Sequence, residues 1–315
     1  MDGAFLDWAL ASFSGYVAAD ELYEGPYCVL SVVDNRQYKR ILYAVLDHDP
    51  THPDITTFLG RLKTALTERD LVLQGITTDG SPLYPEPIRT VFGAVAHQIC
   101  TFHVLKELTQ GILRAVAAER RRLAHSKPTL PRGRPSSKEK TARRLARKSK
   151  QRQEKIRALF QGRFLFVKRR LTPREHRQLL SITRGLPQWR KLREIMEHIS
   201  ALLDRRCRTQ TALDKLRKLR QWVKRFKWMG DTLKKVFSPT LEKALTFLDD
   251  KLLPATSNAV ERGNRRHRKM HKSVYRVRSH VGVEGRIALD MSRESRAENR
   301  AQTIQALHQA RRGSP

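Results

Sequence analysis

Cysteine is scarce in this chain, and long apolar runs and acidic side chains are also few. The 315 residues include three cysteines, Cys28, Cys100 and Cys207, with no Cys-x-x-Cys spacing. This usage argues against a disulfide framework and a structural zinc site, and it predicts a reducing compartment. No run of 18 apolar residues occurs, and no basic segment precedes an apolar core at the N-terminus. We therefore expect neither a membrane span nor a signal peptide.

Positive charge, in contrast, is abundant. Lys and Arg number 63 against 31 Asp and Glu, which gives a formal net charge of +32 and an isoelectric point near 10.9. Such an imbalance predicts a polyanionic partner. The basic residues recur through helix-like segments, and this pattern favours nucleic acid over a membrane surface.

The first hundred residues have the pattern of an α/β fold. Apolar and β-branched runs predict strands at 13–19, 27–33, 38–46, 71–77 and 95–100. A helical period occupies 54–69, and a shorter helix is expected near 86–92. Strands mixed with helices in this order predict a mixed five-stranded sheet rather than a helical bundle.

From about residue 102 the strand pattern stops, and the next ~150 residues have almost entirely the pattern of basic amphipathic helix. Helices are expected at about 173–182, 186–204, 209–228 and 239–250, and a Pro- and Gly-rich break falls at 127–137. We therefore divide the chain into three parts. These are the first part of an α/β core at 1–103, a large helical insertion at 104–250 with a flexible linker at about 126–140, and C-terminal helices at 251–315 that complete the core.

Two aspartates stand where predicted strands end. Asp20 follows the first strand and Asp79 follows the fourth. If these strands are parallel neighbours, both carboxylates meet at their carboxyl ends, where open α/β sheets place their sites. The alternative is ordinary turn chemistry, since Asp and Gly are common in turns such as Asp79-Gly80.

Glu261 is the third acidic residue of interest, because it is surrounded in sequence by cations. Asn258-x-x-Glu261 fits a capping box, in which Asn258 caps a helix and Glu261 bonds back to its amide. The cap does not exclude a metal-binding role, because a helix N-terminus favours the ionised carboxylate that a metal requires. Three convergent carboxylates suffice for two divalent ions, Mg²⁺ or Mn²⁺, of the kind that assist phosphodiester cleavage.

Four short motifs follow one another in a definite order. They are Asp20-Glu21, Thr78-Asp79-Gly80, Cys100-Thr101-Phe102-His103 and Ser257-Asn258-Ala259-Val260-Glu261-Arg262-Gly263-Asn264. Together they resemble the DDE transposases of bacterial and archaeal insertion sequences, over about residues 13–276. The Cys-x-x-His signature and the all-helical insertion before the glutamate resemble the Mutator-like branch of that family.

The resemblance implies a ribonuclease H-like catalytic core in which Asp20, Asp79 and Glu261 bind two Mg²⁺ ions. It implies DNA cleavage at the transposon end, followed by strand transfer of the freed 3′-hydroxyl into target DNA. Cys100 and His103 would then lie near the site. A zinc site there would need two more ligands, which the sequence does not supply, and Cys100 is alternatively a small buried residue.

The resemblance also assigns partners and places. Asn258 and Asn264 match positions that flank the glutamate, and they are expected to orient Glu261 or contact the DNA backbone. Two transposon ends must be paired, so a homodimer or larger assembly on double-stranded DNA is expected, in the cytoplasm and on the nucleoid of a prokaryotic cell. Family members commonly carry a DNA-binding region ahead of the core. Only 19 residues precede Asp20 here, and we expect that region to be lacking.

Two basic segments are predicted to contact DNA. Pro131-Arg132-Gly133-Arg134-Pro135 is similar to the AT-hook core, in which Arg132 and Arg134 would enter the minor groove. The cations that follow Glu261 are expected to contact phosphate near the cleaved strand. They are Arg262, Arg265, Arg266, Arg268, Lys269 and Lys272. A solvated basic surface is the alternative for both segments.

Three functional hypotheses remain open from the sequence. The leading one is the transposase. The second is a ribonuclease H-fold nuclease or resolvase that cuts DNA without strand transfer. The third is an inactive, truncated remnant that only binds DNA. A pre-cut end with a free 3′-hydroxyl distinguishes the first two, since only a transposase joins it to a target.

Overall fold

The computed structural model describes residues 3–126, 140–205, 207–224, 234–273, 279–297, 301–305 and 308. The chain divides into two compact units, one of Met1–His103 with Asp249–Pro315 and the other of Val104–Leu248. Arg132 and Arg134 of the predicted AT-hook, and nearly all of the expected linker, lie outside the described residues. Within the described ranges, no helix has both the length and the apolar composition needed to cross a membrane.

A five-stranded mixed sheet forms the centre of the first unit, as predicted. Its strands are β1 (Tyr16–Glu24), β2 (Tyr27–Asp34), β3 (Arg40–Leu46), β4 (Gly75–Thr78) and β5 (Ala96–Ile99). They are arranged in the order β3-β2-β1-β4-β5. β2 is antiparallel to both β1 and β3, whereas β4 is parallel to both β1 and β5. The central strand, β1, therefore has one antiparallel and one parallel neighbour.

The first strand is longer than predicted, and Asp20 lies in its middle rather than after its end. β1 pairs with β2 as far as Glu24 opposite Tyr27, because the two strands form a hairpin. Its pairing with β4 ends earlier, at Ala18. The polar residues Asp20 and Glu21 resemble a strand end in the sequence, but pairing with the apolar β2 keeps this segment extended. Asp20 thus lies beyond the part of β1 that β4 covers.

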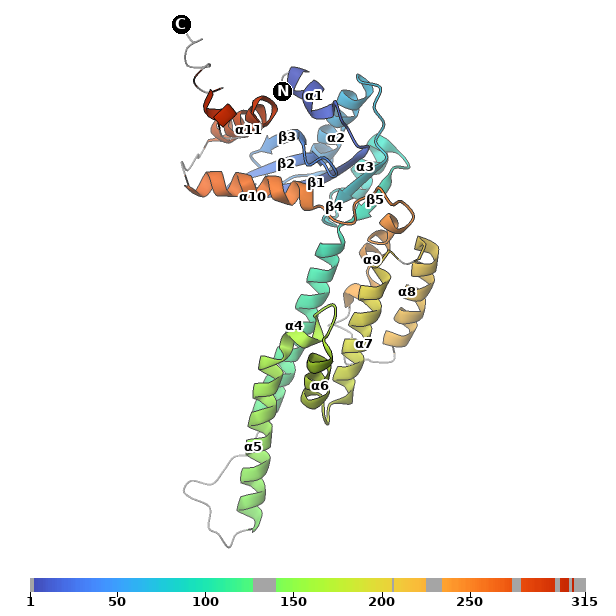
Figure 1. Ribbon diagram of the computed structural model, residues 1–315, viewed down its shortest axis with the longest axis vertical. Helices are drawn as coiled ribbons and strands as arrows, with labels where there is room; N and C mark the ends of the chain where they lie inside the picture. Colours follow the sequence, from blue (N-terminus) through green and yellow to red (C-terminus); the bar gives the residue numbers. More distant parts are fainter. Residues whose placement is uncertain are drawn as a thin grey trace. The chain divides into compact units, whose positions relative to one another are not determined.

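Helices cover both faces of the sheet (Figure 1). On one face Ile55 and Ile88 share a buried cluster with Val17. On the other, Ile287 shares a cluster with Leu22. The first face carries α2 (His52–Thr67) and α3 (Pro85–Phe92), and the second carries α1 (Gly3–Leu10), α10 (Asn258–Ser273) and α11 (His280–Arg296). The C-terminal helices therefore complete the core of the first unit.

A buried ion network links the edge strand β3 and the helices α10 and α11. Arg40 of β3 lies 2.5 Å from Asp290 and 3.0 Å from Glu294, both on α11. Arg266 of α10 lies 2.5 Å from Glu294 and 3.2 Å from Asp290. The Asp290 side chain is 3% exposed. Removing one partner of such a network leaves a charge buried and uncompensated, which is strongly destabilising.

The described residues of the second unit form helices and connecting turns, and none of them is in a strand. Apart from α4 (Thr101–His125), which begins in the first unit, it contains α5 (Lys140–Gln161), η1 (Arg163–Phe166), α6 (Pro173–Ile182), α7 (Pro187–Leu202), α8 (Thr209–Val223), η3 (Lys234–Phe237), α9 (Pro239–Lys243) and η4 (Thr246–Leu248). Its core includes Phe166 and Trp189, whose rings pack edge to face with centroids 5.7 Å apart. The helix predicted at 239–250 is broken. Thr246 turns its hydroxyl back to the Lys243 carbonyl, and only a short 3₁₀ segment follows.

Candidate active site

Asp20 and Asp79 lie together at one end of the sheet. β1 and β4 are parallel, and their last paired residues are Ala18 and Thr77. Extending this register by two residues brings Asp20 level with Asp79. Because strand side chains alternate between faces, both aspartates project from the same face as Ala18. We call Asp20 and Asp79 the aspartate pair.

A tight turn after β4 holds the Asp79 carboxylate. Oδ1 of Asp79 accepts a hydrogen bond of 2.8 Å from the backbone N–H of Ser81. Gly80 between them has φ of +101°, a conformation that glycine adopts without strain. This is the geometry that the turn-chemistry interpretation of Asp79 describes, and the turn fixes the position of the carboxylate after β4.

The environment of Asp20 disfavours its ionised form. Burial raises the pKa of Asp20 to about 7, and the charges of Asp79 and Glu21 add to the rise. His103 and the hydrogen bond from Asn264 act in the opposite direction. A carboxyl group that is half protonated near neutral pH, facing other carboxylates, is an electrostatic arrangement that a bound cation would relieve.

Asn264 connects α10 to the aspartate pair. Its side-chain Nδ2 donates a hydrogen bond of 2.7 Å to Oδ2 of Asp20, and Asn264 is buried. The donor orients one of the two carboxylate oxygens of Asp20. Asn258, the other predicted flanking asparagine, is exposed at the start of α10. Of the two, only Asn264 touches the site.

The predicted capping box is wrong by one residue. α10 begins at Asn258, and the Glu261 N–H bonds to the carbonyl of Ser257, which therefore precedes the helix. The Ser257 hydroxyl lies 3.5 Å from Oε1 of Glu261. Glu261 consequently stands one position further into the first turn than the capping box requires.

The segment before α10 is attached to three neighbouring elements. The Thr77 hydroxyl donates to the Pro254 carbonyl (3.1 Å), and Asn35 Nδ2 donates to the Thr256 carbonyl (3.0 Å). The Thr101 N–H donates to the Ala255 carbonyl (2.9 Å). These bonds place the start of α10 against the ends of β4 and β5, and so they determine where Glu261 lies.

Glu261 lies in a group with Cys100 and His103. Cys100 directly follows β5, His103 is in the first turn of α4, and Glu261 is in the first turn of α10. One ligand atom from each lies within 4.8 Å of the others, and His103 Nδ1 is 3.8 Å from Glu261 Oε1. We call these three residues the mixed cluster. Neither member of the aspartate pair belongs to it.

Contacts within the mixed cluster shift the pKa of two of its groups. Burial alone would raise the pKa of the Cys100 thiol, but hydrogen bonds with His103 and Ser257 outweigh it and lower the pKa. The interaction with Cys100 raises the pKa of His103 against the effect of burial, and the charges of Asp79 and Glu261 add to the rise. The lowered pKa of Cys100 favours its thiolate form, and the raised pKa of His103 favours its protonated, cationic form. His103 is also within electrostatic reach of Asp20, Asp79 and Glu261.

Glu21 belongs to the electrostatics of the site, although the sequence interpretation assigned it no role. It follows Asp20 on β1 and therefore projects toward the opposite face, where burial and the charge of Asp79 raise its pKa. Its partners include Tyr84, which is fully buried and whose pKa rises well above its usual value through burial and the charge of Glu21. The Asp20-Glu21 dipeptide itself was the signal that could have identified this residue.

The basic residues of α10 are not equivalent. Arg262, Arg265, Arg268 and Lys269 are exposed, and the Arg262 guanidinium lies over the Tyr38 ring at 5.0 Å. Arg266 instead joins the ion network with Asp290 and Glu294, so its charge is already compensated. The Lys272 side chain lies outside the described residues.

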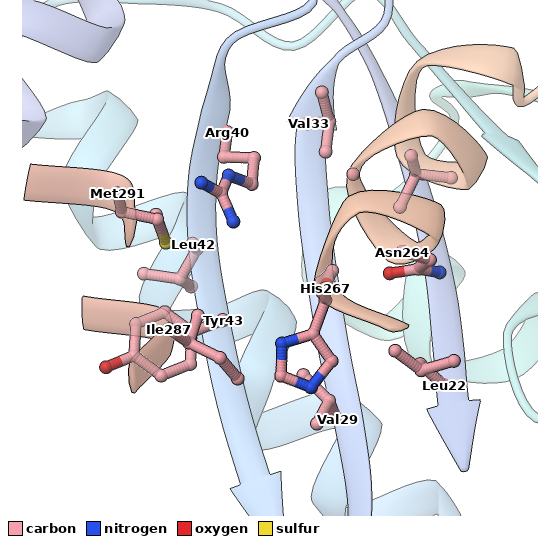
Figure 2. A pocket seen from close by; sticks show the side chains of 13 residues that line it. Leu22, Val29, Val33, Arg40, Leu42, Tyr43, Asn264, His267, Ile287 and Met291 are labelled. Atoms are coloured by element: carbon pink, nitrogen blue, oxygen red, sulfur yellow. The ribbon is translucent and has the colours of Figure 1, made fainter. Parts of the chain in front are cut away.

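A small cavity lies between the sheet and the two C-terminal helices (Figure 2). Arg40 of β3, Asn264 and His267 of α10, and Ile287 and Met291 of α11 surround it. Its volume is about 20 Å³, which is room for a single water molecule. It is therefore a packing gap rather than a substrate pocket.

No protein-family model, curated protein or solved structure matches this chain. The functional argument consequently rests on the residues themselves and on the geometry that brings them together.

Proposed function

We propose that this chain is a DDE transposase that cleaves DNA at transposon ends and transfers the freed 3′-hydroxyl into target DNA. The observation that carries the proposal is the position of His103, which lies within electrostatic reach of three carboxylates from distant parts of the chain. These are Asp20, Asp79 and Glu261. The mixed sheet with helices on both faces is compatible with a ribonuclease H-like core, and it supports the proposal.

The carboxylates suit a hard divalent cation. Asp20 and Asp79 offer oxygen ligands, and the repulsion between them contributes to a pKa of about 7 at Asp20. Such ligands are those that Mg²⁺ and Mn²⁺ prefer. When bound, two such ions would neutralise the phosphate and activate the attacking water or 3′-hydroxyl. Glu261 is the third proposed ligand, and in this structure its carboxylate is with His103.

The chain's own residues hold these ligands in place. Asn264 orients Asp20 through the 2.7 Å hydrogen bond, and the Ser81 N–H orients Asp79. The bonds to residues 254–256 fix the start of α10, which carries Glu261. Exposed Arg265 and Arg268 follow on the same helix, where they can bind phosphates of the strand to be cut.

The second unit supplies a further basic surface. Helix α5 contains a single acidic residue, Glu154, among many cations. Its exposed cations are Arg143, Arg144, Arg147, Lys148, Lys150 and Arg157. Such a helix neutralises phosphates irrespective of base sequence. Because transposition joins two ends, we propose that the chain acts on DNA as a dimer or larger assembly.

The test uses the purified chain with Mg²⁺ or Mn²⁺ and two DNA substrates, an intact transposon end and a pre-cut end with a free 3′-hydroxyl. Joining of the pre-cut end to a target supports the transposase. Cleavage of the intact end without any joining supports a ribonuclease H-fold nuclease. DNA binding without either reaction supports the inactive remnant. A structure with Mn²⁺ would add the direct test, which is whether Glu261 joins the aspartate pair around one ion.

A further inference from the structure

The mixed cluster has the composition of a metal site different from the proposed magnesium site. A thiol, an imidazole and a carboxylate converge within 4.8 Å, from the end of β5, the start of α4 and the start of α10. We propose that Cys100, His103 and Glu261 bind a thiophilic divalent cation of the Zn²⁺ type, as three protein ligands with one open position. This arrangement is typical of zinc sites that keep a water or another ligand in the fourth position.

The hydrogen bonding of the cluster supports this assignment. Nδ1 of His103 is buried and has no hydrogen-bond partner among the residues that the structure describes, although a buried polar atom is normally paired. Its nearby carboxylate oxygen, Oε1 of Glu261, is 3.8 Å away, which is beyond hydrogen-bonding distance. A metal ion between the two atoms would satisfy both. The nitrogen therefore faces the Glu261 carboxylate without a hydrogen-bond partner, and once it has lost its proton it can offer a lone pair to a metal ion.

Cys100 is prepared to act as a thiolate. Its sulfur accepts a hydrogen bond from the Ser257 N–H at 3.4 Å, and the residue is fully buried. It also lies just before the N-terminus of α4, a 25-residue helix, where the helix dipole favours negative charge. The thiolate is the form of cysteine that binds metal.

The distances need only a small adjustment. Ligand bonds to zinc of about 2.0–2.3 Å place tetrahedral ligands roughly 3.5 Å apart. The His103–Glu261 separation of 3.8 Å is already close to this value. All three ligand atoms lie within 4.8 Å of one another, so small side-chain rotations would bring them toward this spacing. A closed structural zinc site would need more protein ligands than these three. An open site does not, because water or another ligand takes the fourth position.

The site has a consequence for Glu261, and this consequence rests on the proposed function. Glu261 cannot serve the mixed cluster and the aspartate pair fully at the same time. Zn²⁺ would hold it beside Cys100 and His103, and Mg²⁺-dependent cleavage would be inhibited. Zinc binding itself does not depend on the chain being a nuclease.

The first experiment titrates the metal-free protein with Co²⁺, a spectroscopic substitute for Zn²⁺. One equivalent should produce a sulfur-to-cobalt charge-transfer band, which Zn²⁺ abolishes and excess Mg²⁺ does not. Cys100→Ser should remove the band, and His103→Asn and Glu261→Gln should each weaken binding by about 100-fold or more, since loss of even an outer-shell partner costs 10–100-fold. Cys207→Ser is the matched control, because that cysteine belongs to the other unit and should leave the band unchanged.

The titration can overturn the proposal in either of two ways. Absence of a charge-transfer band in the unmodified protein would refute it, and so would a band that persists in Cys100→Ser. Circular dichroism and melting curves on each variant show whether a lost band reflects a lost ligand or a lost fold. If Cys100→Ser does not fold, His103→Asn and Glu261→Gln provide the same test on the other two ligands.

The second experiment measures cleavage in Mg²⁺ with increasing Zn²⁺. The Zn²⁺ concentration that halves the rate should rise about 100-fold in Cys100→Ser, with each protein compared with its own zinc-free rate. If no cleavage occurs under any condition but the cobalt band is present, the transposase proposal fails and the zinc site stands. If cleavage occurs and no band forms, the opposite holds.

Discussion

The aspartate pair and the mixed cluster lie within reach of one histidine, yet they are built from different chemistry. The pair offers only carboxylate oxygens, one on β1 and the other in the turn that follows β4, the strand parallel to it. The mixed cluster offers sulfur, nitrogen and oxygen, held at the starts of two helices and the end of a strand. Hard oxygen ligands select Mg²⁺ or Mn²⁺, whereas thiolate and imidazole select Zn²⁺. Glu261 is the residue whose chemistry suits both.

If both groups bind metal as proposed, ligand type rather than proximity would separate two metal sites in a small volume. Backbone pairing fixes the aspartates, because their positions follow from the β1–β4 register. Helix starts fix the mixed cluster, because Cys100, His103 and Glu261 depend on where α4 and α10 begin. Substitutions should therefore affect the two groups differently.

The largest effect is expected from Asp79→Asn. It removes one proposed ligand of the aspartate pair and should lower Mg²⁺-dependent cleavage by about 10³-fold, because a bound cation contributes several kcal/mol to transition-state stabilisation. Cobalt binding by the mixed cluster should be unaffected. Single-turnover cleavage and the cobalt titration measure the two responses. Equal cleavage rates for Asp79→Asn and the unmodified protein would refute the proposed active site.

A smaller effect is expected from Asn264→Ala, which removes the hydrogen bond to Asp20. The loss should lower cleavage about 10–100-fold, as is typical for groups that orient metal ligands. It should also raise the pKa of Asp20 further, so that the pH–rate profile moves to higher pH. Asn258→Ala is the matched control on the same helix and should change neither. A rate loss with an unshifted profile would indicate a merely structural role for Asn264.

The pKa of about 7 at Asp20 predicts how pH affects metal binding. Below pH 7 a proton competes with Mg²⁺ for Asp20, so the apparent affinity should fall about tenfold per pH unit, and above pH 7 it should level off. Calorimetric titration with Mg²⁺ from pH 5.5 to 8.5, at about half-unit steps, measures this. Asp20→Asn should remove the dependence, and a wild-type affinity that does not vary with pH would contradict it.

The same shift predicts the stability of the metal-free protein. Because the folded-state pKa of Asp20 lies above its unfolded value of 3.8, the folded state binds the proton more tightly. The contribution of Asp20 to stability is therefore greatest below about pH 4 and is lost as pH rises toward 7. Asp20→Asn should make the melting temperature less dependent on pH across this window.

Two substitutions on α10 separate DNA binding from fold stability. The double variant Arg265→Ala, Arg268→Ala removes exposed cations and should reduce the slope of log affinity against log salt by about 2. Arg266→Ala should instead lower the melting temperature, because it breaks the network with Asp290 and Glu294. Fluorescence anisotropy over a range of salt concentrations measures the slope. If Arg266→Ala alone reduced it, the assignment of these arginines would be reversed.

The smallest effect is expected from Gly263→Ala, between Glu261 and Asn264. A Cβ at Gly263 would meet its nearest neighbour, Cδ of Arg40, at 3.6 Å, which is ordinary van der Waals contact. Alanine should stabilise the helix by about 0.5–1 kcal/mol and leave cobalt binding unchanged. Melting curves measure the gain. A stable variant that has lost cleavage would mean that substrate approaches the backbone at Gly263.

Much of the first unit was predictable because its signals are local. Runs such as Tyr27–Asp34 (β2) and Arg40–Leu46 (β3) are apolar enough to identify strands, and a parallel β1–β4 pair brings Asp20 to Asp79. The end of β1 was not predictable from composition. It depends on the hairpin with β2, and this pairing outweighs the polar character of Asp20 and Glu21.

The contacts that complete the site have no local signal. Asn264 and Asp20 are 244 positions apart, and Ser257 and Cys100 are 157 apart. The ion network between Arg40 and α11 is equally distant in sequence. Such contacts follow from tertiary packing of α10 and α11 on the sheet, which spacing and composition do not encode. The sequence pattern placed Asn258 just before the helix, whereas α10 begins at Asn258. The cause is the same, since the hydrogen bonds of residues 254–256 determine where the helix begins.

The separation between Asp20 and Asn264 also determines the order in which the site is completed during translation. At about 5–20 residues per second, the 244 positions between them take roughly 10 to 50 s to synthesise. Throughout that interval the nascent sheet lacks α10 and α11, so α1 is the one described helix of this face already made, and Asp20 has no donor from Asn264. The Asp20 carboxylate of the growing chain is therefore made tens of seconds before the residue that orients it. Limited proteolysis of stalled nascent chains should show full protection of β1 only after α10 has emerged.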